Sequence, residues 1–322
     1  MKRSIGFACL LLAAASCAAG EKPPAITDPA KAGPEFQIQG EYQAVIPDDG
    51  VPVKHGVQII ALGNGKFEAV HYVGGLPGDG WDKTEPQRIP GAMKDGAAEF
   101  VSGEITGRAA DGEIKVVAAN NTVVFKKVER ASPTLGAKPP AGAVVLFDGT
   151  SADAFQGGRM TDDGLLMEGA TSKQRFGSFH LHLEFRTPFM PTARGQGRGN
   201  SGVYCQGRYE IQILDSFGLK GENNECGGIY GVAKPLVNAC LPPLSWQTYD
   251  IDFTAAQWKN GQKASNARIT VRHNGILIHD NVEVPKTTTA APVGDGPETG
   301  PIFLQNHGNP VRFRNIWLVE KN

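Results

Sequence analysis

The sequence has little of what marks three common classes of protein. Its 32 basic side chains are balanced by 33 acidic ones, and no long basic run occurs, so the electrostatic footprint of a nucleic-acid-binding protein is absent. The five cysteines contain no Cys-x-x-Cys pair, which removes the usual signature of a structural zinc site. No segment keeps a helical period over three turns, which argues against an all-α fold.

Glycine and proline, by contrast, are plentiful, with 41 and 22 residues in a chain of 322. This composition favours short strands joined by many turns. Asn64-Gly65, Asp111-Gly112 and Asn274-Gly275 each lie between apolar runs, as in β-hairpins. Residues 179–187 and 248–253 alternate between apolar and polar side chains. We therefore predict an all-β chain built around an antiparallel sandwich, with one face of each sheet buried.

The first twenty residues predict an export signal. A basic start precedes an apolar stretch over residues 5–15, which is too short to span a bilayer as a mature helix. Ala14-Ala15-Ser16 before Cys17 resembles the bacterial lipobox, in which the cysteine is lipidated. Ordinary signal cleavage near Ala19 is the alternative. We expect an exported protein, either periplasmic or held at the outer membrane by a lipid on Cys17, with no other membrane contact.

Composition divides the mature chain into four segments. Residues 21–39 are rich in proline and alanine and predict a tether. Residues 40–130 carry short strand signals and predict a small β module, to which we assign no role. Residues 131–142 predict a linker, and residues 143–322 predict the sandwich. A linker at this place predicts that the sandwich folds and works without the β module.

The three cysteines beyond the signal have two expected roles. Cys226 and Cys240 bracket a loop that contains glycine and proline, and an exported protein can close such a loop with a disulfide. Cys205 lies in a strand-like run and is expected to be a small buried hydrophobe.

The strand-like run at residues 209–213 contains the first candidate functional residues. Tyr209, Ile211 and Ile213 fall on one side of a two-residue period, and Glu210 and Gln212 fall on the other. A carboxylate and an amide on one face suit a groove that binds hydroxyl-rich ligands.

Five motifs, in order, give the sequence a family resemblance. They are LFDGT (146–150), FHLHLEFR (179–186), RGNSGVYCQGRYEIQILD (198–215), YDIDF (249–253) and FLQNHGNPVRFRNI (303–316). Residues 143–322 resemble the 3-keto-disaccharide hydrolase family, also described as 3-keto-glycoside 1,2-lyases and 3-keto-2-hydroxy-glucal hydratases. The resemblance implies a concanavalin A-like jelly roll. The loop at 219–245 departs from the common family pattern.

The resemblance also implies a chemistry. A separate dehydrogenase first oxidises C3 of a glycoside, and the ketone acidifies the proton on C2. A base removes that proton, the C1 substituent leaves, and water adds to the resulting 3-keto-2-hydroxy-glucal, so the net reaction is hydrolysis. Such a site needs a base near C2, donors on the C3 oxygen, and an acid or metal near the leaving oxygen.

Several residues are candidates for these roles. Glu210 is the first candidate base and His307 the second, while Arg186 is a candidate for polarising the keto oxygen and Asp215 is a further catalytic candidate. The candidates for binding substrate are Asn200, Gln212, Gln305 and Glu184. Asp215 also has a structural alternative, because it can cap a turn before Ser216.

A divalent metal ion is the possible cofactor. Glu184, His180 and His182 share one face of their predicted strand, and together with Glu210 they form a candidate metal site. The alternatives are a cross-strand ion pair between Glu184 and Arg186, and two histidines that only face solvent.

Two other functions compete with this interpretation. A retaining glycosidase resembling glycoside hydrolase family 16 needs two carboxyl groups about 5–5.5 Å apart. Glu210 and Asp215 lie five residues apart, which on a regular strand gives roughly 16 Å and opposite faces. A non-catalytic carbohydrate-binding module of this fold would show several exposed aromatic side chains, whereas Trp246, Trp258 and Trp317 are scattered.

Overall fold

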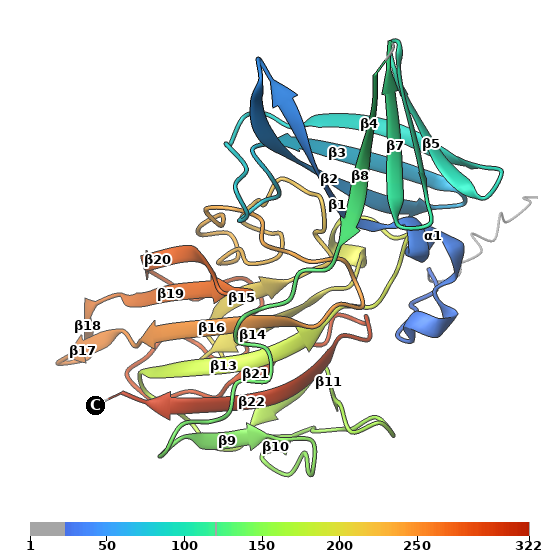
Figure 1. Cartoon of the computed structure of the whole chain (residues 1–322). Helices are drawn as coiled ribbons and strands as arrows, with labels where there is room; N and C mark the ends of the chain where they lie inside the picture. The colour runs from blue at the N-terminus through green and yellow to red at the C-terminus, as the bar shows by residue number, and fades with distance from the viewer. Residues whose placement is uncertain (1–22, 120, 322) are drawn as a thin grey trace, which may run out of the picture.

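The computed structural model describes residues 23–119 and 121–321 and consists almost entirely of strands. A closed eight-stranded barrel lies above a two-sheet sandwich in the view of Figure 1. The all-β prediction is therefore confirmed. The predicted signal peptide and the lipidation site Cys17 lie outside the described residues. Within the part of the chain that is described, no helix is long and apolar enough to cross a membrane.

The predicted β module is an antiparallel barrel in which each strand pairs with the next and the last pairs with the first. Its strands are β1 (Gly40–Asp48), β2 (Val51–Gly63), β3 (Lys66–Val73), β4 (Gln87–Lys94), β5 (Ala97–Ser102), β6 (Ile105–Ala110), β7 (Glu113–Ala118) and β8 (Asn121–Val128). Asn64 and Gly65 both have positive φ, 55° and 71°, as the tight turn between β2 and β3 requires. Closure leaves the barrel without a free edge.

One end of the barrel is sealed by the segment predicted to be a tether. Residues 29–38 form the short helices η1 (Pro29–Lys31) and α1 (Gly33–Ile38), and Ile26 forms a β-bridge with Phe189. Ile38 is buried against the barrel core. The tether prediction is wrong here because proline starts both helices, where its missing N–H is not needed, and because apolar side chains have a surface to cover.

Two antiparallel sheets form the sandwich below the barrel. The five-stranded sheet has the order β10-β12-β21-β14-β15, and the other has the order β11-β22-β13-β16-β19-β20, with β9 added beside β22. The strands are β9 (Val144–Phe147), β10 (Phe155–Gln156), β11 (Leu166–Met167), β12 (Ala170–Ser172), β13 (Phe179–Arg186), β14 (Ser201–Cys205), β15 (Tyr209–Ile213), β16 (Gln247–Thr254), β19 (Ala267–His273), β20 (Ile276–Val284), β21 (Phe303–Leu304) and β22 (Arg312–Glu320). This part of the chain also contains the 3-10 helix η2 (Gly195–Gly197) and a separate hairpin of β17 (Gln257–Lys259) and β18 (Gln262–Ser265). The predicted jelly-roll sandwich is therefore present.

The core of the sandwich lies between the two sheets, as the alternation predicts. Phe179, Leu181, Leu183 and Phe185 of β13 point into it and are fully buried. Tyr209, Ile211 and Ile213 of β15 reach the same core from the opposite sheet. The outer faces of β13 and β15 therefore point in opposite directions, and this separates the candidate residues into two groups.

The predicted linker at 131–142 is packed against the sandwich. In Figure 1 it runs from β8 across β16, β13 and β22 to β9. Gly136 N donates a 2.6 Å hydrogen bond to Glu184, and Trp317 Nε1 donates to the carbonyl of Ala137. The segment thus joins the two units as a packed linker, because its backbone groups bond to polar side chains on the outer face of the larger sheet.

The barrel and the sandwich share hydrophobic side chains. Phe189 and Leu244 of the sandwich belong to the buried cluster of the barrel. Phe217 of the sandwich packs with Ile60 and Tyr72 on the outside of the barrel. The two units are therefore joined by a continuous apolar contact.

Candidate active site

Glu210 and Gln212 lie on the outer face of the five-stranded sheet. The hairpin of β14 and β15 places Tyr204 directly opposite Glu210 and Gly202 opposite Gln212. Because side chains alternate along each strand, all four positions share this face. Glu210 and Gln212 are nevertheless only 2% and 1% exposed, so the sequence predicted their direction and missed how deeply they lie.

The Glu210 carboxyl group has a strongly shifted pKa. Burial raises it from 4.5 to about 7, although a hydrogen bond from Tyr204 favours the ionised form. The Tyr204 hydroxyl lies 2.8 Å from Oε2 and also 3.0 Å from the carbonyl oxygen of Thr289. Tyr204 has one proton to donate, so it can give it to an ionised Glu210, or give it to Thr289 and accept the proton of a neutral Glu210. The pair is built to hold Glu210 in both protonation states near neutral pH.

Gly202 makes room for this carboxyl group. A Cβ atom at position 202 would lie 2.2 Å from Oε1 of Glu210 and 2.9 Å from its Cδ. The hairpin thus keeps Oε1 directly over the β14 backbone. No hydrogen bond reaches Oε1 from the described residues, whereas Oε2 is bound by Tyr204. Oε1 is therefore the atom available to take a proton from a bound molecule.

A group of amides extends from Glu210 along the same face. Gln212 donates to the side chain of Gln196 at 3.0 Å, and Asn200 donates to the Gln196 carbonyl at 2.8 Å. Gln305 Nε2 donates to the Tyr204 hydroxyl at 3.2 Å. The structure thus brings together the predicted residues Glu210, Asn200, Gln212 and Gln305. Within the described chain, Asn200 Oδ1 and Gln212 Oε1 are buried without a partner, so each has unused capacity to accept a hydrogen bond.

Sequence reasoning missed Tyr204 and Gln196. Tyr204 could have been found from the sequence, because a hairpin between β14 and β15 places it opposite Glu210 and on the same face of the sheet. Gln196 lies in the short helix η2, and nothing in its surrounding glycines indicates which strand it contacts.

His307 lies beside this group at the tip of a loop. Gln305 N donates to the Gly202 carbonyl, and Asn200 N donates to the Asn309 side chain. Both ends of the loop are thereby fixed to the start of β14, and His307 between them is exposed. The structure places this second candidate base at the border of the site, with no contact to Glu210 among the described hydrogen bonds.

Glu184, Arg186, His180 and His182 lie on the outer face of the other sheet. Arg314 Nε and Asn315 Nδ2 donate to the Glu184 carboxylate at 2.6 and 2.9 Å. Burial alone would raise the pKa of Glu184, but hydrogen bonds from His182, Asn315, Arg314 and Gly136 lower it to about 2. Glu184 is therefore a fixed anion within a structural network beneath the 131–142 segment.

The proposed metal site of Glu184, His180 and His182 with Glu210 is wrong. β13 and β15 belong to different sheets, and their outer faces point apart. Within the described ranges, no group of three or more His, Cys, Asp or Glu side chains is arranged to hold a metal ion.

Arg186 is likewise remote from Glu210. It donates to the Thr27 carbonyl and lies over the Trp246 ring. The structure therefore does not bring it to the candidate base, and the predicted role on the keto oxygen has no support. The alternative of an ion pair with Glu184 is also wrong, because Glu184 pairs with Arg314.

Asp215 forms a buried ion pair instead of a catalytic pair with Glu210. Arg198 Nε lies 2.6 Å from its Oδ2, and both side chains are buried. Phe217 N donates weakly to Oδ1 at 3.4 Å, in agreement with the alternative of a turn cap. With its charge matched by Arg198, Asp215 is not available as the second carboxylate of a retaining glycosidase.

The three cysteines of the described chain are buried free thiols, so the expected disulfide is not formed in the structure. Cys226 and Cys240 nevertheless lie close enough for each thiol to shift the pKa of the other. Cys205 is a buried core residue, as predicted.

We expect Cys226 and Cys240 to become joined when the protein matures in an oxidising compartment. They already lie together, and a disulfide that closes the loop stabilises the folded state by roughly 3 kcal/mol, because it restricts the unfolded chain. Thiol labelling of denatured, unreduced protein from that compartment should then modify Cys205 but neither of the pair. Labelling of all three would contradict the disulfide.

The raised pKa of Glu210 makes a prediction about stability. A carboxyl group with a raised pKa in the folded state binds its proton more tightly there than in the unfolded chain. Glu210 therefore lowers the free energy of unfolding as pH rises from 4.5 to about 7. We expect Glu210→Gln to have a higher melting temperature than the wild type at pH 8, and the two to converge at pH 5. An equal difference in melting temperature between the two proteins at pH 5 and pH 8 would contradict the raised pKa of Glu210.

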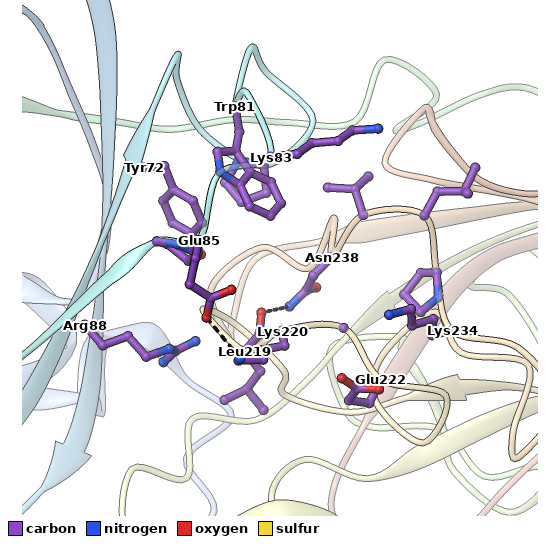
Figure 2. A pocket seen from close by; sticks show the side chains of 16 residues that line it. Tyr72, Trp81, Lys83, Glu85, Arg88, Leu219, Lys220, Glu222, Lys234 and Asn238 are labelled. Atoms are coloured by element: carbon purple, nitrogen blue, oxygen red, sulfur yellow. Dashed lines mark hydrogen bonds and ion pairs between the residues drawn. The ribbon is translucent and has the colours of Figure 1, made fainter.

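A separate cleft of about 390 Å³ lies where the barrel meets the sandwich. Figure 2 shows Trp81 standing edge-on to Tyr72, with Lys83, Glu85 and Arg88 along the barrel side. The opposite wall comes from the loop at 219–245, including Lys220, Glu222, Lys234 and Asn238. Glu210 and its amide neighbours do not line this cleft, so it is distinct from the candidate active site.

Comparison with known proteins assigns the sandwich to a family. Residues 142–319 match the family model described as a 3-keto-alpha-glucoside-1,2-lyase-like domain. A crystal structure from Parabacteroides distasonis ATCC 8503, described as a candidate glycosyl hydrolase, is 34% identical with a TM-score of 0.52, covering 56% of this chain and 85% of that one. A second structure from the same organism with the same description is 16% identical with a TM-score of 0.42, covering 56% and 94%. No match was found among curated proteins.

Proposed function

We propose a specific reaction for this chain, which belongs to the 3-keto-alpha-glucoside-1,2-lyase-like domain family and is a hydrolase-type enzyme of carbohydrate degradation. The proposed reaction is cleavage of 3-keto-glycosides by removal of the C2 proton and elimination at C1. The observation that carries the proposal is the buried Glu210, whose pKa of about 7 suits a general base at neutral pH.

In the proposed mechanism the ionised Glu210 takes the C2 proton on Oε1. The C–H electron pair forms an enolate with the C3 ketone. The enolate then re-forms the ketone while the C1–oxygen bond breaks, which leaves a C1–C2 double bond and a leaving group that takes up a proton. Tyr204 supports the step by donating its hydrogen bond to Oε2, which holds the carboxylate in place and leaves Oε1 as the atom that takes the proton.

The neighbouring amides would hold the sugar during this step. The partnerless oxygens of Asn200 and Gln212 are acceptors for sugar hydroxyls, and Gln305 offers an N–H group beside Tyr204. Because Glu210 is almost fully buried, we propose that substrate enters past the exposed tip of the 305–309 loop, which carries His307. Addition of water to the glucal product would complete the reaction, so that its net result is hydrolysis.

The proposed substrate places the enzyme after a separate sugar 3-dehydrogenase, since the C2 proton is acidic only once C3 is a ketone. An exported enzyme would meet such substrates in the periplasm or at the outer membrane, so the predicted signal and Cys17 lipid form part of this proposal.

A reaction in heavy water tests the mechanism. We expect the enzyme to cleave a 3-keto-disaccharide and to give either a 3-keto-2-hydroxy-glucal, which has no hydrogen on C2, or a hydrated product with deuterium at C2, because the C2–H bond breaks on the way. The unoxidised disaccharide is the matched control and should stay intact. Cleavage of the keto substrate to a product that keeps its original hydrogen at C2 would overturn the elimination, and cleavage of the unoxidised control would favour direct glycoside hydrolysis.

A further inference from the structure

The β barrel contains a cavity of about 360 Å³, a size typical of small-molecule sites. All eight strands contribute to its lining. Eleven of the sixteen lining residues are apolar, among them Phe100, Ile114 and Phe125. An interior of this kind is poorly hydrated, because water finds few polar partners in it.

The cavity is closed at one end and open at the other. Toward helix α1 the interior is filled by tightly buried side chains, among them Tyr42, Ile59 and Phe67. At the opposite end the lining reaches Ser102, Ile105 and other residues beside the turns that join β1 to β2, β5 to β6 and β7 to β8. Ile105 there is 46% exposed. The barrel is therefore a cup with an apolar interior and a mouth that carries Ser102, Ile105 and Asn121.

The polar groups of the lining are few and uncharged at neutral pH. They are His71, Gln87, Ser102 and Asn121. His71 Nε2 lies 2.9 Å from Nδ1 of His55, and the two rings are stacked. Burial lowers the pKa of both histidines, so the pair is neutral.

The charge around the cup disfavours anions. The lining contains no lysine or arginine among its described residues. Asp48 lies at the β1–β2 turn and acts on His55. A carboxylate or phosphate in the cup would have no cation to pair with, and burying an unpaired charge is costly.

We propose that the barrel is a binding site for a neutral, largely apolar small molecule with at most one or two hydroxyl or carbonyl groups. Its apolar part fills the space between Phe100, Ile114 and Phe125, and its polar atom meets His71. Barrels of about eight strands have an interior wide enough for one small ligand when side chains do not fill it. This site is independent of Glu210 and of the proposed reaction.

Gly107 on β6 offers a direct test, because it lines the cavity. A Cβ atom there would meet only Phe100 and Ile114, at 3.7–3.9 Å, which is ordinary contact. Gly107→Leu therefore adds a side chain to the empty space without a backbone clash. Val117 on the neighbouring strand is 42% exposed, and Val117→Leu is the control that places a leucine on the outer face of the barrel instead of in the cup.

The experiment titrates the full chain with N-phenyl-1-naphthylamine, a neutral fluorescent probe. We expect saturable 1:1 binding in the wild type and in Val117→Leu, and at least tenfold weaker binding in Gly107→Leu. 1-Octanol should displace the probe at a concentration at least tenfold lower than octanoate. Ala118→Leu, at the mouth of the cup, is the second variant if Gly107→Leu does not fold.

Two results would overturn the proposal. One is the absence of saturable binding to the wild type, and the other is unchanged binding in a folded cavity-filling variant. Equal displacement by octanol and octanoate would overturn the neutral ligand class. Activity on a 3-keto-glycoside should be the same in all variants, which separates this test from that of the proposed reaction.

Discussion

Replacing Glu210 with glutamine is expected to lower turnover of a 3-keto-glycoside by about 10²-fold or more, the usual scale for loss of a general base. The amide keeps the size of the side chain and can still contact Tyr204, so fold and substrate binding should persist. What is lost is the group that takes the C2 proton. In the wild type, turnover should rise with pH to a plateau with an apparent pKa near 7, because burial raises the pKa of Glu210 to about 7 and only the ionised form is a base.

Two neighbouring variants separate catalysis from binding. Gln212→Ala should mainly raise KM, because it removes a hydrogen-bonding amide and leaves the carboxylate in place. Gly202→Ala should mainly lower kcat, because the added Cβ overlaps Oε1 of Glu210 and displaces it. In the Glu210→Gln background, Gly202→Ala should cost little further activity. Wild-type turnover in Glu210→Gln, or a pH profile with no step near neutrality, would contradict the assignment of the base.

Local alternation in the sequence is sufficient to find the centre of this site. Tyr209, Ile211 and Ile213 must face the core, so Glu210 and Gln212 must face away from it, and they do. Burial of the carboxylate could not be predicted in the same way. It depends on Thr288, whose hydroxyl accepts from the Glu210 backbone N–H 78 residues away, and on Thr289, whose carbonyl accepts from the Tyr204 hydroxyl 85 residues away.

Alternation fails when residues on different sheets are grouped. His180, His182 and Glu184 share one face of their strand, as predicted, but the two-residue period of a strand does not show to which sheet that strand belongs. Placing Glu210 beside them needed the pairing of β13 with β16 and β22, and of β15 with β14. Those pairings are set by contacts distant in sequence, so the metal site and the role of Arg186 were beyond local reasoning.

Composition did not reveal, for a different reason, that residues 29–38 and 132–137 pack against partner surfaces. Proline and alanine are common in flexible segments, but they are also compatible with short helices and extended straps that have a partner surface. Residues 29–38 find the end of the barrel, and residues 132–137 find the polar side chains of Glu184 and Thr248. Neither surface can be seen in the sequence of the segment itself.

These packed segments change the expectation for the isolated sandwich. A fragment of residues 143–322 should melt at least about 10 °C below the whole chain, or fail to fold. It exposes Phe189, Phe217 and Leu244, which the barrel covers. Burying an apolar side chain of this size stabilises by about 1.5–3 kcal/mol, so roughly 5 kcal/mol or more is lost, and each kcal/mol shifts the melting temperature by about 2–4 °C.

A second fragment of residues 131–322 separates the two sources of that stability. It lacks the barrel but keeps the 131–142 segment, in which the Gly136 N–H donates to Glu184 and the Ala137 carbonyl accepts from Trp317. It should melt between the shorter fragment and the whole chain. Relatives of the sandwich can consist mostly of this domain, since the 34% identical structure is matched over 85% of its length. The fold itself therefore does not require a barrel, and the dependence predicted here comes from the apolar side chains that this chain places beneath one. A melting temperature of the 143–322 fragment within about 3 °C of the whole chain would show that those contacts contribute little.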